Sequence, residues 1–130
     1  MTEEQLTSIS ELSATLGLTT RTLRYWEEVG IIESAERADG AARGYTPYFV
    51  RRIKFIMKLK HLGLTIKEMQ ALYAFYGEAK QTDKLLPALL KTLDTHIETL
   101  DSRVSTLIAL KKEIETYRQR IVAKLAAGDP

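Results

Sequence analysis

The sequence predicts a mostly α-helical protein in two parts, a unit of short helices followed by one long helix. Up to residue 77, apolar residues recur with the helical period of about 3.6, in segments that begin at capping residues and end at glycines. From residue 84 to residue 126 the period becomes about 3.5. We therefore expect a first domain over residues 1–77, a linker over 78–83, a long helix over 84–126 and a tail over 127–130.

The composition excludes several classes of function. Of the 130 residues, 45% are hydrophobic and 28% are charged, and no apolar run approaches the roughly 18 residues of a membrane span. The segment from Met1 to Gln5 is polar and acidic, unlike a signal peptide, so we expect a cytoplasmic protein that does not enter membranes. The absence of cysteine excludes disulfides, thiolate metal sites and cysteine redox sensors.

The residues that enzymes need are scarce. The seven glycines are scattered at helix ends and turns, so no glycine-rich phosphate loop is present, and no nucleophile stands with a base. The two histidines, His61 and His96, are far apart in sequence, which favours surface or packing roles over metal ligation. We expect no enzymatic activity, no metal and no cofactor.

A capping box predicts the first helix. The Ser8 hydroxyl and the Glu11 carboxylate can each satisfy a backbone donor at a helix start near Ile9. Apolar residues follow at helical spacing as far as Gly17, which suits the left-handed position after a helix. The first helix is therefore expected over residues 9–16.

A second helix is expected after a turn of three residues. Thr19 can cap a helix that runs from Thr20 to about Val29 and ends at Gly30. Two short helices joined by a three-residue turn that contains glycine match the helix-turn-helix pattern.

The next segment, Ile31 to Tyr45, has no helical period. It holds small, charged and glycine residues between short apolar ends, which predicts a β-ribbon or loop that we call the wing. Thr46 followed by Pro47 then predicts the start of a third helix, which runs to Leu62 and ends at Gly63.

A second capping box, Thr65 to Glu68, predicts a fourth helix that runs to about Tyr76 and closes at Gly77. Tyr73, Phe75 and Tyr76 either pack in the core or line a small apolar pocket near the long helix. The four helices and the wing together predict a winged helix-turn-helix domain.

The long helix carries one apolar seam that nothing else in the chain is long enough to cover. Pro87 is expected in its first turn, near Lys84. Pairing with a second copy would bury the seam, whereas an internal helical hairpin is the alternative. The seam residues are Leu86, Leu90, Leu93, Ile97, Leu100, Val104, Leu107, Ile114, Ile121 and Leu125.

Two cations interrupt the seam and predict how the copies are oriented. In a parallel pair, Lys111 and Arg118 would each face their own copy, which stacks like charges in a buried position. In an antiparallel pair their long stems would lie on leucines of the other copy. We therefore expect an antiparallel dimeric coiled coil.

Positive charge is concentrated in one stretch. Between Arg43 and Lys67 there are seven basic residues and no acid, whereas the rest of the chain has 12 basic and 17 acidic residues. A solvated helix face is one interpretation, and a nucleic-acid interface is the other.

The second helix favours the nucleic-acid interpretation. Leu23 and Trp26 can face the core, which leaves polar residues near the exposed N-terminal half of the helix. In a helix-turn-helix that half enters the major groove, where arginine matches guanine edges or phosphate. The exposed residues are Thr20, Arg21, Arg24 and Tyr25.

At this point the sequence resembles the MerR family, over roughly residues 8 to 76. The resemblance continues through Arg43-Gly44-Tyr45-Thr46, Arg52-Ile53 and Leu62-Gly63-Leu64-Thr65-Ile66-Lys67-Glu68. Trp26 and the pair Ala41-Ala42 depart from the family's pattern. The first-domain positions that match without a gap are Ile9, Glu11, Leu12, Gly17, Thr19, Arg21, Thr22, Leu23, Arg24, Tyr25, Glu27 and Gly30.

The resemblance implies roles for individual residues. DNA bases or the DNA backbone would be contacted by Thr20, Arg21 and Arg24, and a DNA phosphate would be contacted by Tyr25. DNA would be contacted from the wing by Arg43 and Tyr45. The expected DNA-binding set is Thr19, Thr20, Arg21, Arg24, Tyr25, Arg43, Tyr45, Arg51 and Arg52.

The resemblance also implies a mechanism. A homodimer would bind an inverted repeat in a promoter with an over-long spacer, and distortion of that double-stranded DNA would let RNA polymerase engage. A small-molecule effector is compatible with this scheme, but no residue identifies one. An architectural winged-helix protein and a pure interaction adaptor are the alternatives: the long helix disfavours the former, and the basic stretch disfavours the latter.

Overall fold

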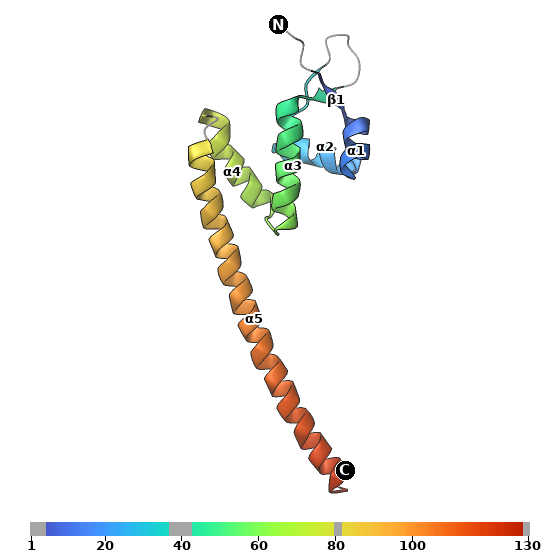
Figure 1. Cartoon of the computed structure of the whole chain (residues 1–130), viewed down its shortest axis with the longest axis vertical. Helices are drawn as coiled ribbons and strands as arrows, with labels where there is room; N and C mark the ends of the chain where they lie inside the picture. The colour runs from blue at the N-terminus through green and yellow to red at the C-terminus, as the bar shows by residue number, and fades with distance from the viewer. Residues whose placement is uncertain (1–4, 37–42, 80–81, 129–130) are drawn as a thin grey trace. The chain divides into compact units, whose positions relative to one another are not determined.

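The computed structural model describes residues 5–36, 43–79 and 82–128. It contains two compact units, one ending at Leu89 and one beginning at Leu90, which we describe separately (Figure 1). In the described residues, the first unit contains helices α1 to α4, the start of α5 and two short strands. The second unit contains the rest of α5. The mostly helical fold, with a helix-turn-helix, a small wing and a long C-terminal helix, confirms the predicted fold class.

Helices α1 (Ile9–Leu16) and α2 (Thr20–Glu28) form the helix-turn-helix. Gly17 makes the turn with a φ of 70°, in the left-handed region that favours glycine. The Ser13 hydroxyl donates a hydrogen bond to the carbonyl of Leu18 and closes the turn from inside. The predicted bounds of both helices agree with the structure to within one residue.

Side-chain caps begin the helices as the sequence predicts. Each cap satisfies a backbone N–H that has no partner within its helix. At Thr65 and Glu68 the capping box is reciprocal. The distances are 3.1 Å from Glu11 N to Ser8 Oγ, 3.3 Å from Phe49 N to Thr46 Oγ1, 3.1 Å from Glu68 N to Thr65 Oγ1 and 2.9 Å from Thr65 N to Glu68 Oε1.

The base of the wing is a small antiparallel sheet. Strand β1 (Thr7–Ser8) pairs with β2 (Gly44–Tyr45), with Thr7 opposite Tyr45 and Ser8 opposite Gly44. On the edge of β2 that faces away from β1, Gly44 forms two backbone hydrogen bonds with Ala35, of 2.7 and 2.9 Å. We did not predict β1, because two residues are too few to show a strand period. The wing residues 37–42, which include Ala41 and Ala42, lie outside the described residues.

Helix α3 (Pro47–His61) begins as predicted and ends one residue before the predicted Leu62, whereas α4 (Ile66–Ala79) is longer than predicted. We expected α4 to close at Gly77, but this glycine lies within its last turn. Glycine within a helix costs only about 1 kcal/mol relative to alanine, so it does not by itself stop a helix.

Helix α5 (Thr82–Ala126) also begins earlier than predicted, so that Pro87 lies beyond its first turn. Proline there removes one helical hydrogen bond. Leu85 and Leu89, on either side of it, are 5% and 8% exposed, and their burial in the first unit holds this turn in place. The seam residue Leu86, in contrast, is 53% exposed.

The core of the first unit joins its five helical segments and β2. Its members are apolar side chains, with no buried charged residue among the residues described. Trp26 and Tyr45 are the largest of them. The core consists of Leu12, Leu23, Trp26, Ile31, Ile32, Tyr45, Ile53, Ile56, Leu59, Leu64, Met69, Leu72, Tyr73, Leu85 and Leu89.

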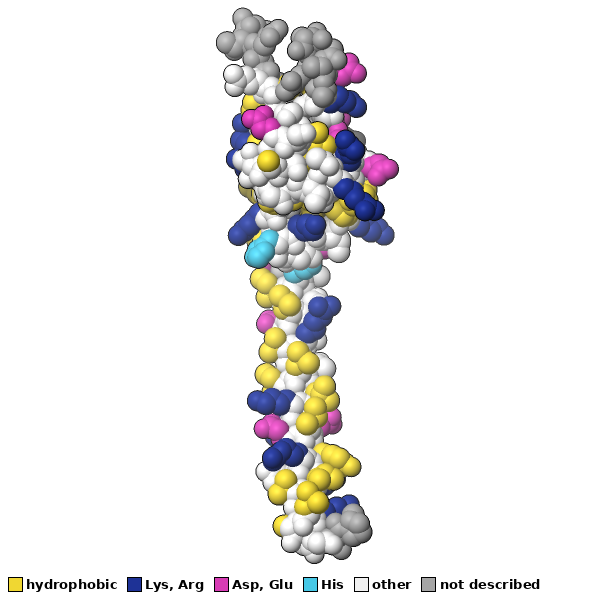
Figure 2. Space-filling model, turned by 90° about the vertical axis from the view of Figure 1, so that its right-hand side faces the viewer, with side chains coloured by type: hydrophobic (Ala, Val, Ile, Leu, Met, Phe, Trp, Pro, Cys, Tyr) yellow, Lys and Arg dark blue, Asp and Glu magenta, His cyan; other side chains and the backbone are white. Residues whose placement is uncertain are grey.

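The second unit has no buried residue among those that the structure describes. Every residue from 97 to 128 is exposed, and hydrophobic side chains follow the helix along its length (Figure 2). In the described part of the chain, no helix has the length and apolar character needed to cross a membrane. The large exposed side chains include Leu90, Ile97, Leu100, Val104, Leu107, Ile108, Leu110, Ile114, Tyr117, Ile121, Val122 and Leu125.

The close approach of β1 to β2 predicts the effect of a side chain at Gly44. A Cβ added there would lie 2.9 Å from Leu6 Cβ and 3.0 Å from the Thr7 carbonyl oxygen. Gly44→Ala should therefore lower the free energy of unfolding by about 2 kcal/mol, measured by chemical denaturation. Gly17→Ala is the control, because it meets no atom within 4 Å and adds only left-handed strain, which costs about 1 kcal/mol. Wild-type stability of Gly44→Ala would contradict the described pairing of β1 with β2.

Candidate nucleic-acid interface

Helix α2 buries one face and presents the other to solvent. Leu23 and Trp26 are 0% and 1% exposed, respectively. Arg21, Arg24 and Tyr25 are all exposed. The rotation of this helix therefore agrees with the one predicted from the spacing of its apolar residues.

Two threonines at the start of α2 have different surroundings. Thr19 Oγ1 accepts a hydrogen bond from the backbone N–H of Thr22 at 3.0 Å and lies 2.8 Å from Thr22 Oγ1. Thr19 therefore caps the helix. Thr20, the first residue of the helix, is half-buried.

A groove lies beside the recognition helix, between α2 and the turn that joins α3 to α4. Arg21 and Tyr25 line it from α2, and Lys60 and Thr65 line it from the other side. The ammonium of Lys60 is 5.9 Å from the centre of the Trp26 ring. The backbone N–H groups of Thr65 and Glu68 are taken by their capping box, so the positive charge that borders the groove comes from Arg21 and Lys60. A groove bordered by two cations is a candidate contact for a DNA phosphate.

We had not predicted Lys60 or Thr65 as site residues. Lys60 belongs to the acid-free basic stretch, and Thr65 begins a capping box, so each had a signal in the sequence. Their proximity to α2 depends on tertiary packing between segments about 40 residues apart. No local pattern contains that information.

A second hollow joins α2 to the wing. Arg24 and Arg43 both line it, although they come from different elements. Glu27 and Tyr45 line the same hollow, and the Tyr45 hydroxyl donates a hydrogen bond of 3.0 Å to Glu27 Oε2. The structure thus brings the predicted arginines of the recognition helix and of the wing base to one place.

Tyr45 lies in the core, which differs from its predicted role as a DNA contact. Its side chain is only 1% exposed. Burial, reinforced by the Glu27 carboxylate, raises the pKa of Tyr45 far above its usual value, while Arg24 and Arg43 oppose that rise. The hydroxyl therefore stays protonated and links the wing base to α2. Tyr45 therefore positions the wing base relative to α2.

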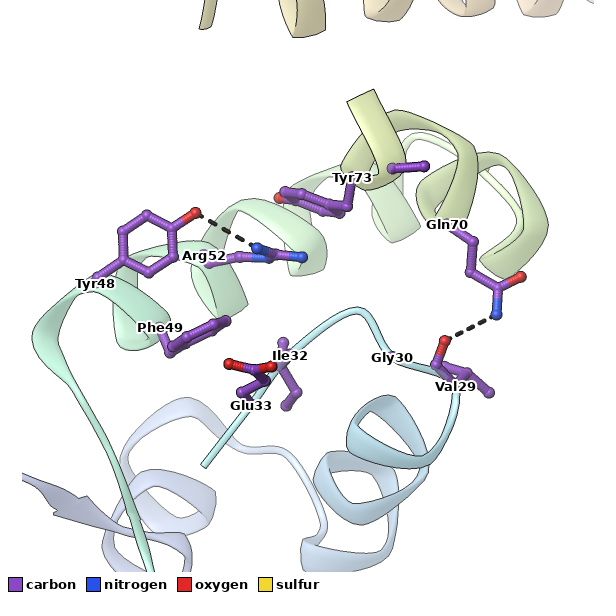
Figure 3. Close-up of a pocket in the computed structure, with 10 residues that line it drawn as sticks. Val29, Gly30, Ile32, Glu33, Tyr48, Phe49, Arg52, Gln70 and Tyr73 are labelled. Atoms are coloured by element: carbon purple, nitrogen blue, oxygen red, sulfur yellow. Dashed lines mark hydrogen bonds between the residues drawn. The ribbon is translucent and has the colours of Figure 1, made fainter. Parts of the chain in front are cut away.

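The two arginines of α3 also differ from each other. Arg51 is exposed, as expected of a residue that contacts a partner. Arg52 is half-buried, and its guanidinium carbon lies 3.7 Å from the centre of the Tyr73 ring and 5.3 Å from that of Phe49 (Figure 3). Its Nη1 donates a hydrogen bond of 3.4 Å to the Tyr48 hydroxyl. Aromatic packing thus holds Arg52, which we expected among the DNA contacts.

Neither histidine takes part in a metal cluster within the described part of the chain. There, no three histidine, aspartate or glutamate residues gather in a way that would hold an ion. Tyr73 is buried, at 8% exposure, and also borders a hollow, so both interpretations of this residue apply. The side chains of Phe75 and Tyr76 lie outside the described residues.

Comparison with protein families identifies two overlapping matches. Residues 7–75 match the family described as MerR HTH family regulatory protein. Residues 50–117 match a second one, described as MerR, DNA binding. Together they span the helix-turn-helix, the wing, α3, α4 and most of α5.

Curated relatives match over most of their own length. The chain is 28% identical over 115 residues to an HTH-type transcriptional regulator ZntR homolog of Haemophilus influenzae, covering 88% of this chain and 83% of the relative. It is 28% identical over 110 residues to the HTH-type transcriptional regulator CueR of Yersinia pestis, covering 82% and 79%.

Solved structures share the fold. The transcription regulator PbrR691 from Ralstonia metallidurans, in complex with lead(II), superposes with a TM-score of 0.68 at 24% identity, covering 88% of this chain and 86% of that one. HiNmlR, a MerR family regulator lacking the sensor domain and bound to promoter DNA, superposes with a TM-score of 0.60 at 14% identity, covering 96% and 97%.

The protonated state of Tyr45 predicts a loss of stability in alkali. Because the folded protein raises the pKa of this hydroxyl, its stabilising contribution is complete below the unfolded pKa of about 10 and is lost as the pH rises above it. The free energy of unfolding should fall between pH 10 and pH 11 by up to about 1.4 kcal/mol more in the wild type than in Tyr45→Phe. Chemical denaturation at both pH values measures the difference.

Exposed Tyr117 provides the control for this experiment. Tyr117 is 64% exposed, so Tyr117→Phe should keep the full alkaline loss of the wild type. Equal losses in the wild type and in Tyr45→Phe would show that Tyr45 does not hold its proton more tightly than a free tyrosine.

Proposed function

The chain belongs to the MerR family of DNA-binding transcription regulators, and we propose that it binds an inverted-repeat promoter operator as a homodimer and distorts the DNA. The observation that carries this proposal is the arrangement of charge around α2. Arg21, Arg24 and Tyr25 are exposed on the recognition helix, with Lys60 on one side of it and Arg43 on the other. A helix flanked by cations suits a major groove between two phosphate backbones.

The contacts divide into those that read bases and those that hold phosphates. We assign Arg21 and Arg24 to base edges or to the backbone near them, because an arginine fork matches guanine or phosphate. Tyr25, Arg43 and Arg51 would hold phosphates. These contacts fix the register of the protein on DNA without reading sequence.

Three other predicted residues receive a supporting role in the proposal. Thr19 caps α2, Tyr45 hydrogen-bonds to Glu27, and Arg52 is held by aromatic rings of α3 and α4. Each of these three residues orders a helix or strand that carries a proposed DNA contact. We keep Thr20 among the proposed DNA contacts, because it is the first residue of α2 and is partly exposed.

The exposed side chains of α5 support the homodimer. A helix with this many exposed apolar side chains is unstable alone in water, and a second copy can cover them. We propose an antiparallel pair. In that arrangement Lys111 does not face Lys111 of the second chain, and Arg118 does not face Arg118 of the second chain. Two recognition helices at a fixed separation then read the two halves of an inverted repeat.

Regulation would work through the cost of bending DNA. Smoothly bending a DNA site of roughly 20 to 30 base pairs costs on the order of 1 to 6 kcal/mol, which is enough to change how RNA polymerase engages a promoter. The DNA-bound relative HiNmlR, described as lacking a sensor domain, supports promoter binding by a chain of this length. We place the protein in the cytoplasm, with the DNA, and propose no catalytic activity for it.

The first prediction of this proposal concerns the two arginines of α2. Selection of duplex DNA from a random pool should yield an inverted repeat. Arg21→Ala and Arg24→Ala should each weaken binding to that repeat by about 1 to 3 kcal/mol, measured by fluorescence anisotropy. Lys112→Ala is the control, because it removes an exposed charge from α5 and should leave affinity unchanged. Unaltered affinity of both arginine variants, with folding intact, would exclude α2 as the recognition helix.

A second prediction concerns the dimer. Leu100 is 56% exposed near the middle of the seam, so Leu100→Asp would place a charge in the buried interface. Analytical ultracentrifugation should show monomers, and binding to the selected repeat should be lost. Ser102→Asp adds the same charge on the face away from the seam and should remain dimeric. A dimeric Leu100→Asp would contradict the proposed seam.

A third prediction concerns the orientation of the two helices. In an antiparallel pair centred near Leu100, two copies of residue 118 are about 54 Å apart at about 1.5 Å per residue. Arg118→Cys should therefore stay reduced under mild oxidation, with its thiols still reactive in a free-thiol assay. Ready formation of a disulfide-linked dimer would mean that the helices run parallel.

A further inference from the structure

A hollow of about 800 Å³ lies in the first unit, and Figure 3 shows the residues that line it. Its walls come from the turn after α2, the segment that leads to the wing, α3 and α4. The volume is within the range of small-molecule sites in proteins, roughly 300 to 1,000 Å³. None of the exposed DNA-binding residues proposed above lines it.

The hollow contains a cation, Arg52, for which the described residues supply no anionic partner. Arg52 lines it, and in the described part of the chain no carboxylate forms an ion pair with this guanidinium. Its hydrogen bond to the Tyr48 hydroxyl is long, at 3.4 Å, and its Nε is buried without a hydrogen-bond partner among the described residues. A buried N–H that has lost water without gaining a hydrogen bond costs free energy, and an anion bound to this guanidinium would offset part of that cost.

Aromatic rings surround this cation. The guanidinium lies on the Tyr73 ring, with Phe49 on another side, so its position is fixed before any ligand arrives. Tyr48 and Phe49 meet edge to face, with ring centres 5.0 Å apart. Their surfaces also line the hollow, which suits a flat apolar body next to a negatively charged group.

A carboxylate of the protein limits the charge that the hollow can accept. Glu33 lines it opposite Arg52 and is exposed, so a second negative charge on a ligand would be repelled. We propose that this hollow binds a small aromatic monocarboxylate, with its carboxylate on Arg52 and its ring against Phe49, Tyr48 and Tyr73.

The location gives such a ligand a way to affect the DNA-binding elements. Gln70 of α4 donates a hydrogen bond of 2.9 Å to the carbonyl of Val29, at the end of α2, and both residues line the hollow. A ligand that fills the space would thus contact the supports of the recognition helix and of the wing. Its role as an effector rests on the proposed function, whereas its binding does not.

Isothermal titration calorimetry of the free full-length protein tests the site without DNA. The probes are benzoate, salicylate and 1-naphthoate, with 1-naphthamide as the neutral counterpart. At least one carboxylate should bind saturably with one site per chain, and 1-naphthamide at least tenfold more weakly than 1-naphthoate. Arg52→Gln should weaken carboxylate binding at least tenfold, whereas Lys54→Gln, which removes an exposed charge from the same helix, should change it less than twofold.

Several outcomes would overturn the inference. These are the absence of saturable binding for all three carboxylates, equal binding of acid and amide, or wild-type binding by a folded Arg52→Gln. If Arg52→Gln does not fold, the comparison of acid with amide on the wild type decides. DNA affinity is measured separately on the selected repeat, so loss of the inferred site and loss of the proposed function give different results.

Discussion

Burial of Leu23 and Trp26 sets the rotation of α2 about its own axis, and the surface offered to DNA depends on that rotation. Each of these side chains contributes on the order of 1.5 to 3 kcal/mol when fully buried. Turning the helix by one residue, about 100°, would expose them and bury polar side chains in their place, such as that of Arg24 in the place of Leu23. The exposed positions of Arg21 and Arg24 are therefore a consequence of core packing, and they need no contact of their own to hold them.

Local signals predicted most of the fold because they act over three or four residues. Capping boxes, glycines with a left-handed φ and a proline after a threonine each specify a helix boundary through short-range hydrogen bonds or sterics. These rules succeeded at Ser8, Gly17, Thr46 and Thr65. They failed at Pro87, where burial of neighbouring leucines outweighs the lost hydrogen bond.

The candidate site was less predictable, because residue type alone does not say where a long side chain points. Arg51 and Arg52 are adjacent in sequence and identical in chemistry, yet one is exposed and the other packs on aromatic rings. The difference comes from Tyr73, about 20 residues away, whose ring receives Arg52. Lys60 was missed for the same reason, since only the folded chain brings it to the groove beside α2.

The hydrogen bond between Tyr45 and Glu27 has a consequence for how the protein meets its ligand. It joins the wing base to the recognition helix before DNA arrives, across 18 positions in sequence. Ordering a loose segment at an interface costs conformational entropy, roughly 0.5 to 1.5 kcal/mol for each immobilised flexible side chain. Elements that are already ordered avoid that cost. A single buried hydroxyl therefore gives the two elements a preorganised geometry, so that differences in affinity between DNA sequences reflect contacts and DNA shape more than the ordering of the protein.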